Sequence, residues 1–265
     1  MKSVAELLDL TGKTAIVTGG AAGIGLGISR RLAEAGAGVL IADLDGEGAR
    51  LAAKELSGEG YRVAGTAADV ADEFDARDVI DEAVRLFGGV DILVNNAGIY
   101  PNVPLAALEP ESFDRVVAVN LRGVYLFTRF ASEQMKTQGR GGRIINVTSI
   151  DALHPSMIGL AAYDAAKHGA WGFTKNAAAE LAPYGIGVNA VAPGGVTTPG
   201  TADMIGGQTA AADAEALQAA FLAKIPMRRM GEPDEIGKVV LFLASDMASY
   251  MTGSQVVVDG GALLS

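Results

Sequence analysis

Short runs of β-branched and other apolar residues alternate with alanine-rich amphipathic stretches along the chain, and this alternation constrains the fold most. The runs cover residues 14–19, 38–43, 63–69, 91–98, 142–149, 186–194 and 254–261. Several are almost continuously apolar, which is typical of strands buried on both faces of a sheet. Between them, stretches such as 27–36 and 76–88 have the period of amphipathic helices. Strands and helices in this order predict an α/β fold, a doubly wound parallel sheet with helices on both sides.

The charge and composition argue against several classes of function. The 265 residues carry a formal net charge of −10, which disfavours nucleic acid and anionic membranes as partners. The absence of cysteine excludes disulfides, thiolate nucleophiles and cysteine metal sites. His154 and His168 lack the spacing of metal ligands, so no metal site is predicted. With neither a signal-like N-terminus nor an apolar run of membrane-spanning length, we expect a cytoplasmic protein.

The organisation of the chain predicts one domain over residues 1–265. No linker, repeat or low-complexity segment interrupts the alternation. The one irregular region, 200–226, is rich in Gly, Ala and Thr. We interpret it as an insertion before the last helix that closes over a ligand as a lid.

The first apolar run leads into a glycine-rich turn, T-G-G-A-A-G-I-G, at residues 18–25. Glycines between a strand and a helix let the backbone approach a phosphate, and the helix N-terminus supplies N–H donors and partial positive charge. The spacing T-G-x-x-x-G-x-G is not the strict G-x-G-x-x-G pattern. A merely tight turn would look similar, but the strand before it and the helix after it favour a dinucleotide site.

Acidic and amide residues follow the next strands. Asp43 ends the second run, 18 positions after Gly25, where an acid can bind the adenosine ribose of NAD. No Arg or Lys stands at 20–22 or 44–46 to bind a 2′-phosphate, so NAD is favoured over NADP. Asp69 ends the third run, where it could accept a hydrogen bond from the adenine amino group. Because the carboxyl ends of parallel strands share one edge, these residues are expected to gather there.

Tyr163 and Lys167 lie four positions apart in a small-residue stretch with helical character. On a helix they would share a face, and an ammonium beside a phenol lowers the pKa of the phenol. Such a pair could serve as an acid–base group near neutral pH, or it could be a coincidence of two common residues.

Four motifs occur in one order: T-G-x-x-x-G-x-G, N-N-A-G, Y-x-x-x-K, and P-G-x-V-x-T at 193–198. Together they resemble the short-chain dehydrogenase/reductase (SDR) family over nearly the whole chain, from Leu10 to Gly261. The resemblance implies a single Rossmann-type domain with a seven-stranded parallel sheet, a nicotinamide cofactor and hydride transfer.

The resemblance also implies a catalytic set. Tyr163 matches the family's acid–base tyrosine and Lys167 its partner. Ser149 matches the serine that orients the substrate oxygen, and Asn120 the asparagine that holds a water in a proton relay. The motifs and the resemblance assign to the cofactor site Gly19, Ala22, Gly23, Ile24, Gly25, Asp43, Leu44, Asp69, Val70, Asn96, Ala97, Gly98, Tyr163, Lys167, Pro193, Gly194, Val196 and Thr198.

One departure from the family pattern concerns the substrate. Tyr163 follows Ser149 by 14 positions, one more than is usual in the family, which indicates a one-residue insertion within 150–160. That loop would border the substrate, and its Asp151 and His154 could bind hydroxyl groups or simply face solvent. Tyr100, just after N-N-A-G, could also reach the pocket.

The predicted function is NAD-dependent oxidation of a secondary alcohol such as a sugar or polyol. The alternative within the family is a 3-oxoacyl-thioester (acyl carrier protein) reductase, which usually prefers NADPH and often has a basic patch, so Asp43 and the acidic charge speak against it. A hypothesis from a different functional class is a non-catalytic protein that senses the cofactor. Such a protein would be expected to lack one of the catalytic residues, but Tyr163, Lys167 and Ser149 are all present. The resemblance implies a homotetramer, with dimers built partly on the helix at 161–182.

Overall fold

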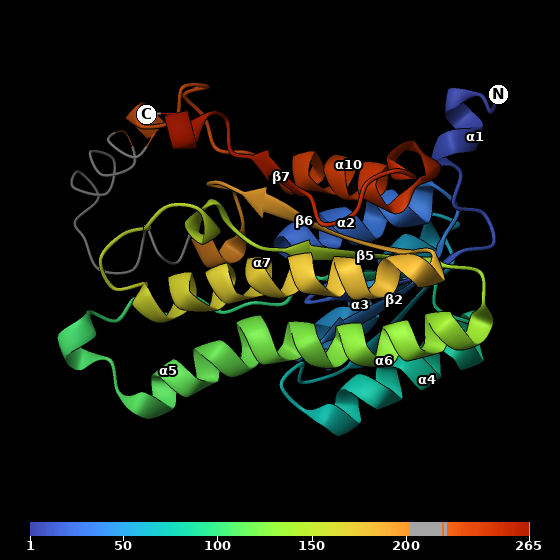
Figure 1. The fold of residues 1–265 in the computed structure, drawn as a ribbon, viewed down its shortest axis with the longest axis horizontal. Coiled ribbons are helices and arrows are strands. Elements are labelled where there is room, and N and C mark those ends of the chain that lie inside the picture. Colours follow the sequence, from blue (N-terminus) through green and yellow to red (C-terminus); the bar gives the residue numbers. More distant parts are fainter. Residues whose placement is uncertain (202–218, 220–221, 265) are drawn as a thin grey trace.

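Seven parallel strands form one sheet in the computed structural model, which describes residues 1–201, 219 and 222–264 (Figure 1). The order across the sheet is β3-β2-β1-β4-β5-β6-β7. The strands are β1 (Thr14–Thr18), β2 (Gly38–Asp43), β3 (Val63–Ala67), β4 (Ile92–Asn95), β5 (Gly142–Val147), β6 (Ile186–Pro193) and β7 (Gln255–Val258). Each of the seven runs predicted as a strand forms one, and the predicted doubly wound sheet is confirmed.

Strand β1 lies at the point where the winding of the chain reverses. It pairs with β2 on one side, from Thr14 against Gly38, and with β4 on the other, from Ala15 against Ile92. In open parallel sheets, ligands bind beyond the carboxyl ends of the strands at such a point. The topology therefore directs attention to the segments that follow β1, β2 and β4.

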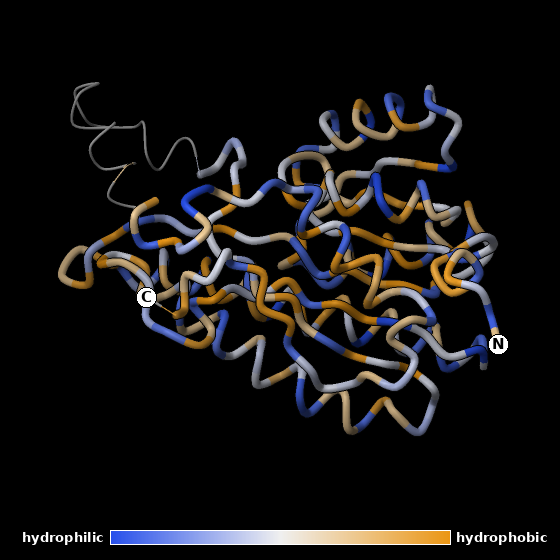
Figure 2. Tube along the Cα trace, turned by 90° about the horizontal axis from the view of Figure 1, so that it is seen from above, coloured by the Kyte–Doolittle hydropathy of each residue, from blue (hydrophilic) through white to orange (hydrophobic). Residues whose placement is uncertain are grey.

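Helices cover both faces of the sheet (Figures 1 and 2). Apolar side chains of α2, α3 and α10 pack on one face, and those of α4, α6 and α7 pack on the other. The α-helices are α1 (Val4–Leu8), α2 (Gly23–Glu34), α3 (Gly46–Gly58), α4 (Glu73–Phe87), α5 (Pro110–Val117), α6 (Gly123–Gln138), α7 (Ala161–Leu181) and α10 (Pro233–Ala244). Short 3₁₀ turns span Leu105–Ala107, Ile150–Ala152, Ala182–Tyr184, Asp246–Ala248 and Ala262–Leu264, and a π-helical turn spans Ala118–Arg122.

The central strands make the core. Every residue of β1 and β4 is buried, and Ile16 and Leu93 have no exposed surface. The edge strand β3 is only partly buried, as expected where one side of a strand lacks a neighbour. In Figure 2 the hydrophobic segments accordingly concentrate in the interior strands.

Most of the strands end one to three residues before the apolar runs did, and β2 alone ends where its run ends. β4 stops at Asn95, and the side-chain amide of Asn96 turns back toward the carbonyl oxygens of Thr18 and Gly19. β3 stops at Ala67, so Asp69 lies in the connection to α4. At the end of β4 the chain thus makes polar contacts that hydrophobic patterning does not register.

The predicted lid at 200–226 falls mainly on 202–218 and 220–221, which lie outside the described residues. Among the helices that the structure describes, none combines the length and apolar character needed to cross a membrane.

Candidate active site

The backbone of the glycine-rich turn after β1 is shaped so that a ligand can approach it closely. Gly19 and Gly23 have φ angles of 60° and 51°, which L side chains rarely adopt. A Cβ on Gly25 would lie 2.0 Å from the Gly19 carbonyl oxygen. No side chain fits at these positions, so the backbone itself lines the space between β1 and α2.

The N-terminus of α2 has no acceptor of its own. Its N-cap is Ala22, without a side-chain hydrogen bond, and its first turn contains no acid. By contrast, the N-caps of α3 and α4 are Asp45 and Asp72, whose carboxylates accept from backbone N–H groups. The unpaired N–H groups of α2 and its partial positive charge fit a pyrophosphate.

Asp43 faces the start of this turn from the end of β2. Its carboxylate accepts hydrogen bonds of 3.1 Å from the N–H groups of Ala21 and Asp45. The carboxylate is thus fixed beside the glycine turn by two backbone N–H groups.

Asp69 has a partner that the sequence analysis missed. Arg115, at the end of α5, donates to one oxygen of its carboxylate at 3.0 Å, and the Ala71 N–H donates to the other at 2.9 Å. No motif marks Arg115, which lies 46 positions away, so only the fold reveals the contact. An adenine amino group would share this carboxylate with Arg115.

The N-N-A-G segment ties β4 to the glycine turn. The side-chain amide of Asn96 donates to the carbonyl oxygens of Thr18 and Gly19, at 3.0 and 2.9 Å. The Thr18 hydroxyl in turn accepts from the N–H groups of Asn96 and Ala97. Thr18 therefore supports this edge of the sheet, a role that its place in the first motif did not indicate.

The predicted nicotinamide side comes from the segment after β6. Pro193 ends that strand, and Gly194 sits against Asp259, whose Cα would lie 2.8 Å from an added Cβ. Val196 is buried, and the Thr198 side chain lies 3.2 Å from the position of a Cβ on Gly23. The residues predicted at 193–198 are thus brought against the glycine turn.

Asn120 is fully buried in the π-helical turn between α5 and α6. Its Nδ2 donates to the carbonyl oxygens of Ile99 and Val116, while its Oδ1 has no hydrogen-bond partner among the residues that the structure describes. A Cβ on Gly98 would lie 2.7 Å from this Oδ1 and 3.6 Å from the Nζ of Lys167. The Asn120 Oδ1 and the Lys167 ammonium therefore border the same space beside Gly98. A buried acceptor and a donor arranged in this way suit a bound water.

Lys167 reaches this space from α7. The side chain is 4% exposed, its Nζ donates to the Val147 carbonyl at 2.8 Å, and it lies 5.5 Å from the centre of the Tyr163 ring. Burial lowers the pKa of Lys167 to about 8, and the Asp151 carboxylate opposes this shift. The helical i, i+4 arrangement predicted from the sequence is confirmed.

The pKa of Tyr163 moves opposite to the direction predicted from its spacing to Lys167. Burial of the phenol raises this pKa first, and the Asp151 carboxylate raises it further, while the neighbouring Ser149 hydroxyl lowers it. The prediction was wrong because Lys167 directs its ammonium to a carbonyl oxygen, and because the cost of removing a phenolate from water outweighs the effect of the Ser149 hydroxyl. These surroundings hold Tyr163 as a neutral phenol.

Ser149 opens the 3₁₀ turn Ile150–Ala152 directly after β5. Its hydroxyl donates to Asp151 Oδ2 at 2.9 Å and accepts from the Asp151 N–H at 3.2 Å. Burial raises the pKa of Asp151, and the bond from Ser149 lowers it. The loop with the extra residue therefore brings a carboxylate against the predicted catalytic serine.

The other two predicted substrate residues differ in position. The Tyr100 ring meets the Tyr163 ring edge-on at 5.9 Å between centres, and its hydroxyl lies 2.1 Å from where a Gly200 Cβ would be. Tyr100 thus forms a wall beside Tyr163. His154 is exposed, with its Nδ1 2.8 Å from the Pro155 carbonyl oxygen, and reaches Asp151 only through its charge.

A family model described as enoyl-(acyl carrier protein) reductase matches residues 19–262. A crystal structure of a short-chain type dehydrogenase/reductase from Mycobacterium marinum superposes with a TM-score of 0.90 at 36% identity, covering 98% of this chain and 99% of that one. The chain belongs to the short-chain dehydrogenase/reductase family.

Its SDR relatives act on different substrates. The 4-formylbenzenesulfonate dehydrogenase of Comamonas testosteroni is 43% identical, over 96% of this chain and 99% of that protein. The L-rhamnose 1-dehydrogenase (NAD(P)(+)) of Azotobacter vinelandii is 38% identical, over 97% and 98%. The 3-oxoacyl-[acyl-carrier-protein] reductase of Thermotoga maritima is 37% identical, over 97% and 100%. This SDR protein is an NAD(P)-dependent oxidoreductase of a small-molecule substrate.

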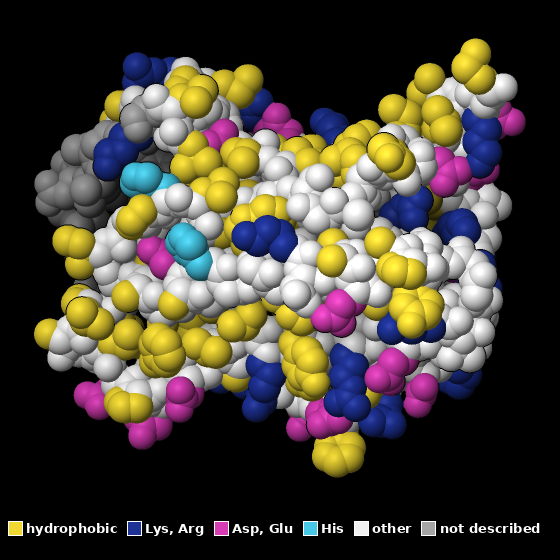
Figure 3. Space-filling model, viewed as in Figure 1, with side chains coloured by type: hydrophobic (Ala, Val, Ile, Leu, Met, Phe, Trp, Pro, Cys, Tyr) yellow, Lys and Arg dark blue, Asp and Glu magenta, His cyan; other side chains and the backbone are white. Residues whose placement is uncertain are grey.

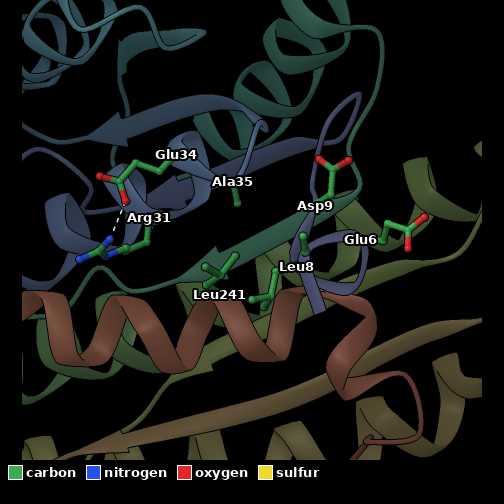
Figure 4. A pocket seen from close by; sticks show the side chains of 8 residues that line it. Glu6, Leu8, Asp9, Arg31, Glu34, Ala35 and Leu241 are labelled. Carbon is green, nitrogen blue, oxygen red and sulfur yellow. Dashed lines mark hydrogen bonds and ion pairs between the residues drawn. The ribbon is translucent and has the colours of Figure 1, made fainter. Parts of the chain in front are cut away.

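A second hollow of this SDR domain lies away from the strand ends. An open cleft of about 510 Å³ runs between α1, α2 and α10 (Figure 4). Its polar groups already have partners: Glu6 bonds Ser3, Asp9 accepts from the Thr11 N–H, and Arg31 pairs with Glu34. With its charges so engaged, this cleft offers no chemistry comparable to the Tyr163 site. The part of the chain that the structure describes also contains no group of side chains able to hold a metal ion.

Proposed function

We propose that the chain is an NAD-dependent dehydrogenase of secondary alcohols, with sugars, polyols or similar hydroxy compounds as substrates. The observation that carries this proposal is the half-buried Tyr163 with the buried Lys167 and Ser149 at the same sheet edge as the glycine turn. The hydroxyl groups of Tyr163 and Ser149, which can exchange protons or hydrogen bonds with an alcohol oxygen, thus lie beside a site that fits a dinucleotide.

Tyr163 would take the proton of the alcohol during oxidation and return it during reduction, with Ser149 donating to the reacting oxygen as charge develops there. A nicotinamide cofactor held along the glycine turn and residues 193–198 would accept the hydride, and its positive ring would favour the phenolate. Lys167 and Asn120 would hold a water between them. This water would carry the proton outward, because the Asn120 Oδ1 has no other partner within the described part of the chain.

Asp43 supports NAD as the cofactor. It is held by the N–H groups of Ala21 and Asp45 at the position where a 2′-phosphate would meet a negative charge. The named relatives do not decide this point, since the L-rhamnose dehydrogenase is described for both cofactors.

The second candidate is a 3-oxoacyl-thioester reductase. It is favoured by the description of the matching family model and by the relative from Thermotoga maritima. The net charge of −10 and the Asp43 carboxylate favour the first proposal.

The first test follows reduced nicotinamide by its near-ultraviolet absorbance. Purified protein is mixed with NAD or NADP and a panel of sugars, polyols, hydroxysteroids and simple secondary alcohols, and separately with NADH or NADPH and 3-oxoacyl thioesters. Turnover with NAD on hydroxy compounds supports the proposal. Turnover mainly with NADPH on 3-oxoacyl thioesters would favour the second candidate.

The variant Tyr163→Phe tests the role of the phenol. It keeps the ring but removes the proton carrier, so we expect kcat to fall at least about 1,000-fold while NAD binding, measured by calorimetry, survives. Tyr61→Phe, outside the site, serves as the matched control. A Tyr163→Phe protein with wild-type turnover would refute the mechanism.

A further inference from the structure

The loop with the extra residue places a carboxylate where it competes for the Ser149 proton. We propose that Asp151 makes this site selective for alcohols that carry a second hydroxyl next to the reacting carbon. That hydroxyl would replace Ser149 as the donor to Asp151 and release the Ser149 proton for the reacting oxygen. The inference rests on the proposed dehydrogenase function and deepens it.

The first step concerns the one proton of Ser149. A hydroxyl donates once, and here it donates to Asp151 Oδ2 at 2.9 Å. While that bond persists, Ser149 can only accept from a reacting alcohol and cannot stabilise the negative oxygen that forms. An alcohol with a single hydroxyl must therefore draw this proton away from a charged acceptor, which holds it more strongly than a neutral one does.

The second step concerns the acceptor capacity of Asp151. Among the described residues, no donor bonds its other oxygen, Oδ1, and the side chain is only partly buried. A carboxylate accepts several hydrogen bonds. A hydroxyl on the neighbouring carbon of a substrate bound at Ser149 would satisfy Asp151, which a hydrocarbon substituent cannot do.

The third step concerns how the loop is held. Asp164, next to Tyr163 on α7, accepts from the Ser156 N–H at 3.1 Å and from the Ser156 hydroxyl at 2.7 Å. These bonds fasten the far end of the loop to α7, and Ser149 fastens the near end. The Asp164 carboxylate is thus occupied by its hydrogen bonds to Ser156, and the Asp151 carboxylate is the one available to a ligand.

The fourth step concerns charge. The charged and titratable groups near Asp151 are His154 on its own loop and three residues of α7, Tyr163, Asp164 and Lys167. Two carboxylates against one buried ammonium make the surroundings of Asp151 unfavourable for an anionic substituent. We therefore expect sulfonated or carboxylated alcohols to be poor substrates, unlike the sulfonate named for the relative from Comamonas testosteroni.

The test compares cis-1,2-cyclohexanediol with cyclohexanol at saturating NAD. Both are neutral and share one ring, so they differ in the second hydroxyl alone. For the wild type we expect kcat/KM to be about 10- to 100-fold higher for the diol, as befits a hydrogen bond to a charged group. In Asp151→Ala that ratio should fall to within about threefold of one.

Two further variants sharpen the test. Asp151→Asn keeps an acceptor without charge and should give an intermediate ratio, which also covers the case that the alanine variant fails to fold. Asp78→Asn, an exposed aspartate on α4, is the matched control and should keep the wild-type ratio.

Two results would overturn the inference while leaving the proposed function standing. One is an equal loss on both substrates in Asp151→Ala, which would mean that Asp151 only supports Ser149. The other is a wild-type enzyme that oxidises both alcohols equally well. A wild type that oxidises no alcohol with either cofactor would instead reject the proposed dehydrogenase function, and this inference with it.

Discussion

At the scale of the residue, burial sets the protonation of the two central groups. It raises the pKa of Tyr163 and lowers that of Lys167 to about 8. Both shifts have one cause, since a charged form loses water on entering the protein. The site thus favours the uncharged form of each side chain, and a bound substrate or cofactor has to supply the compensating interactions.

A pH dependence follows for the two directions of the proposed reaction. Oxidation needs the phenolate of Tyr163, and because its pKa is raised, the deprotonated fraction grows as pH increases through the neutral range. We expect kcat/KM for oxidation to rise by up to about tenfold per pH unit between pH 6 and 8, and that for reduction not to rise. Initial rates in both directions across this range provide the measurement. Oxidation that is independent of pH would contradict the prediction.

Asp43 carries a prediction about cofactor choice. Asp43→Asn keeps an acceptor for the Ala21 N–H but removes the negative charge. We expect kcat/KM to fall about 10-fold or more with NAD and to rise with NADP, since a charged hydrogen bond is lost and a repulsion removed. Steady-state kinetics with both cofactors measure the ratio, with Asp78→Asn as control. An unchanged ratio of kcat/KM with NAD to kcat/KM with NADP would show that Asp43 does not select the cofactor by its ribose.

At the scale of the element, the turn between β1 and α2 depends on glycine for two separate reasons. Gly19 and Gly23 adopt positive φ angles, whereas Gly25 is needed because of contact with the Gly19 carbonyl. The sequence motif marks these positions alike, but only the structure separates a conformational requirement from a steric one.

Gly25→Ala tests the steric requirement. Its Cβ would lie 2.0 Å from a backbone oxygen that cannot move without reshaping the turn. We expect NAD affinity to fall at least about 100-fold and the free energy of unfolding to fall by about 1–3 kcal/mol. Calorimetric titration and urea unfolding measure the two quantities.

Gly58→Ala is the matched control for that variant. Gly58 lies in α3 with no heavy atom within 4 Å of an added Cβ. Alanine there should leave NAD binding as it is and should stabilise the protein by about 0.5–1 kcal/mol. Equal NAD affinities and equal unfolding free energies for Gly25→Ala and Gly58→Ala would contradict the steric explanation for Gly25.

At the scale of the whole molecule, much of the architecture could be predicted from the sequence. The seven strands, the helix carrying Tyr163 and Lys167, and the family follow from apolar periodicity and from motifs that are local in the chain. The contacts of Asp69 with Arg115 and of Asn120 with the space beside Gly98 could not be predicted, because they join distant segments. The pKa direction of Tyr163 was missed for the same reason, since spacing reveals neighbours on one helix but not the burial around them.

The assembly of the molecule also carries a prediction. Tyr125 of α6 is 42% exposed and meets Phe173 of α7 edge-on, with 6.3 Å between the ring centres. The helices α6 and α7 run across the face shown in Figure 3. The family resemblance implies a homotetramer with dimers built partly on α7, against which Tyr125 packs, so light scattering should give about four times the chain mass of 27.0 kDa. Tyr125→Glu should reduce the mass, while Phe74→Glu on α4 should not. A wild-type monomer would reject the assembly.

The parallel sheet has a consequence for how the chain folds. No two neighbouring strands are joined by a hairpin, and Thr14 reaches its buried partner Asp91 across 77 residues. Long chain segments must therefore close before the first stable pairing forms, which makes folding slow relative to helical proteins of this size. The glycine turn gains its support from β4 only when Asn96 bonds Thr18 and Gly19. A nascent chain should therefore not hold this turn in its final shape until the residues through Asn96 have left the ribosome.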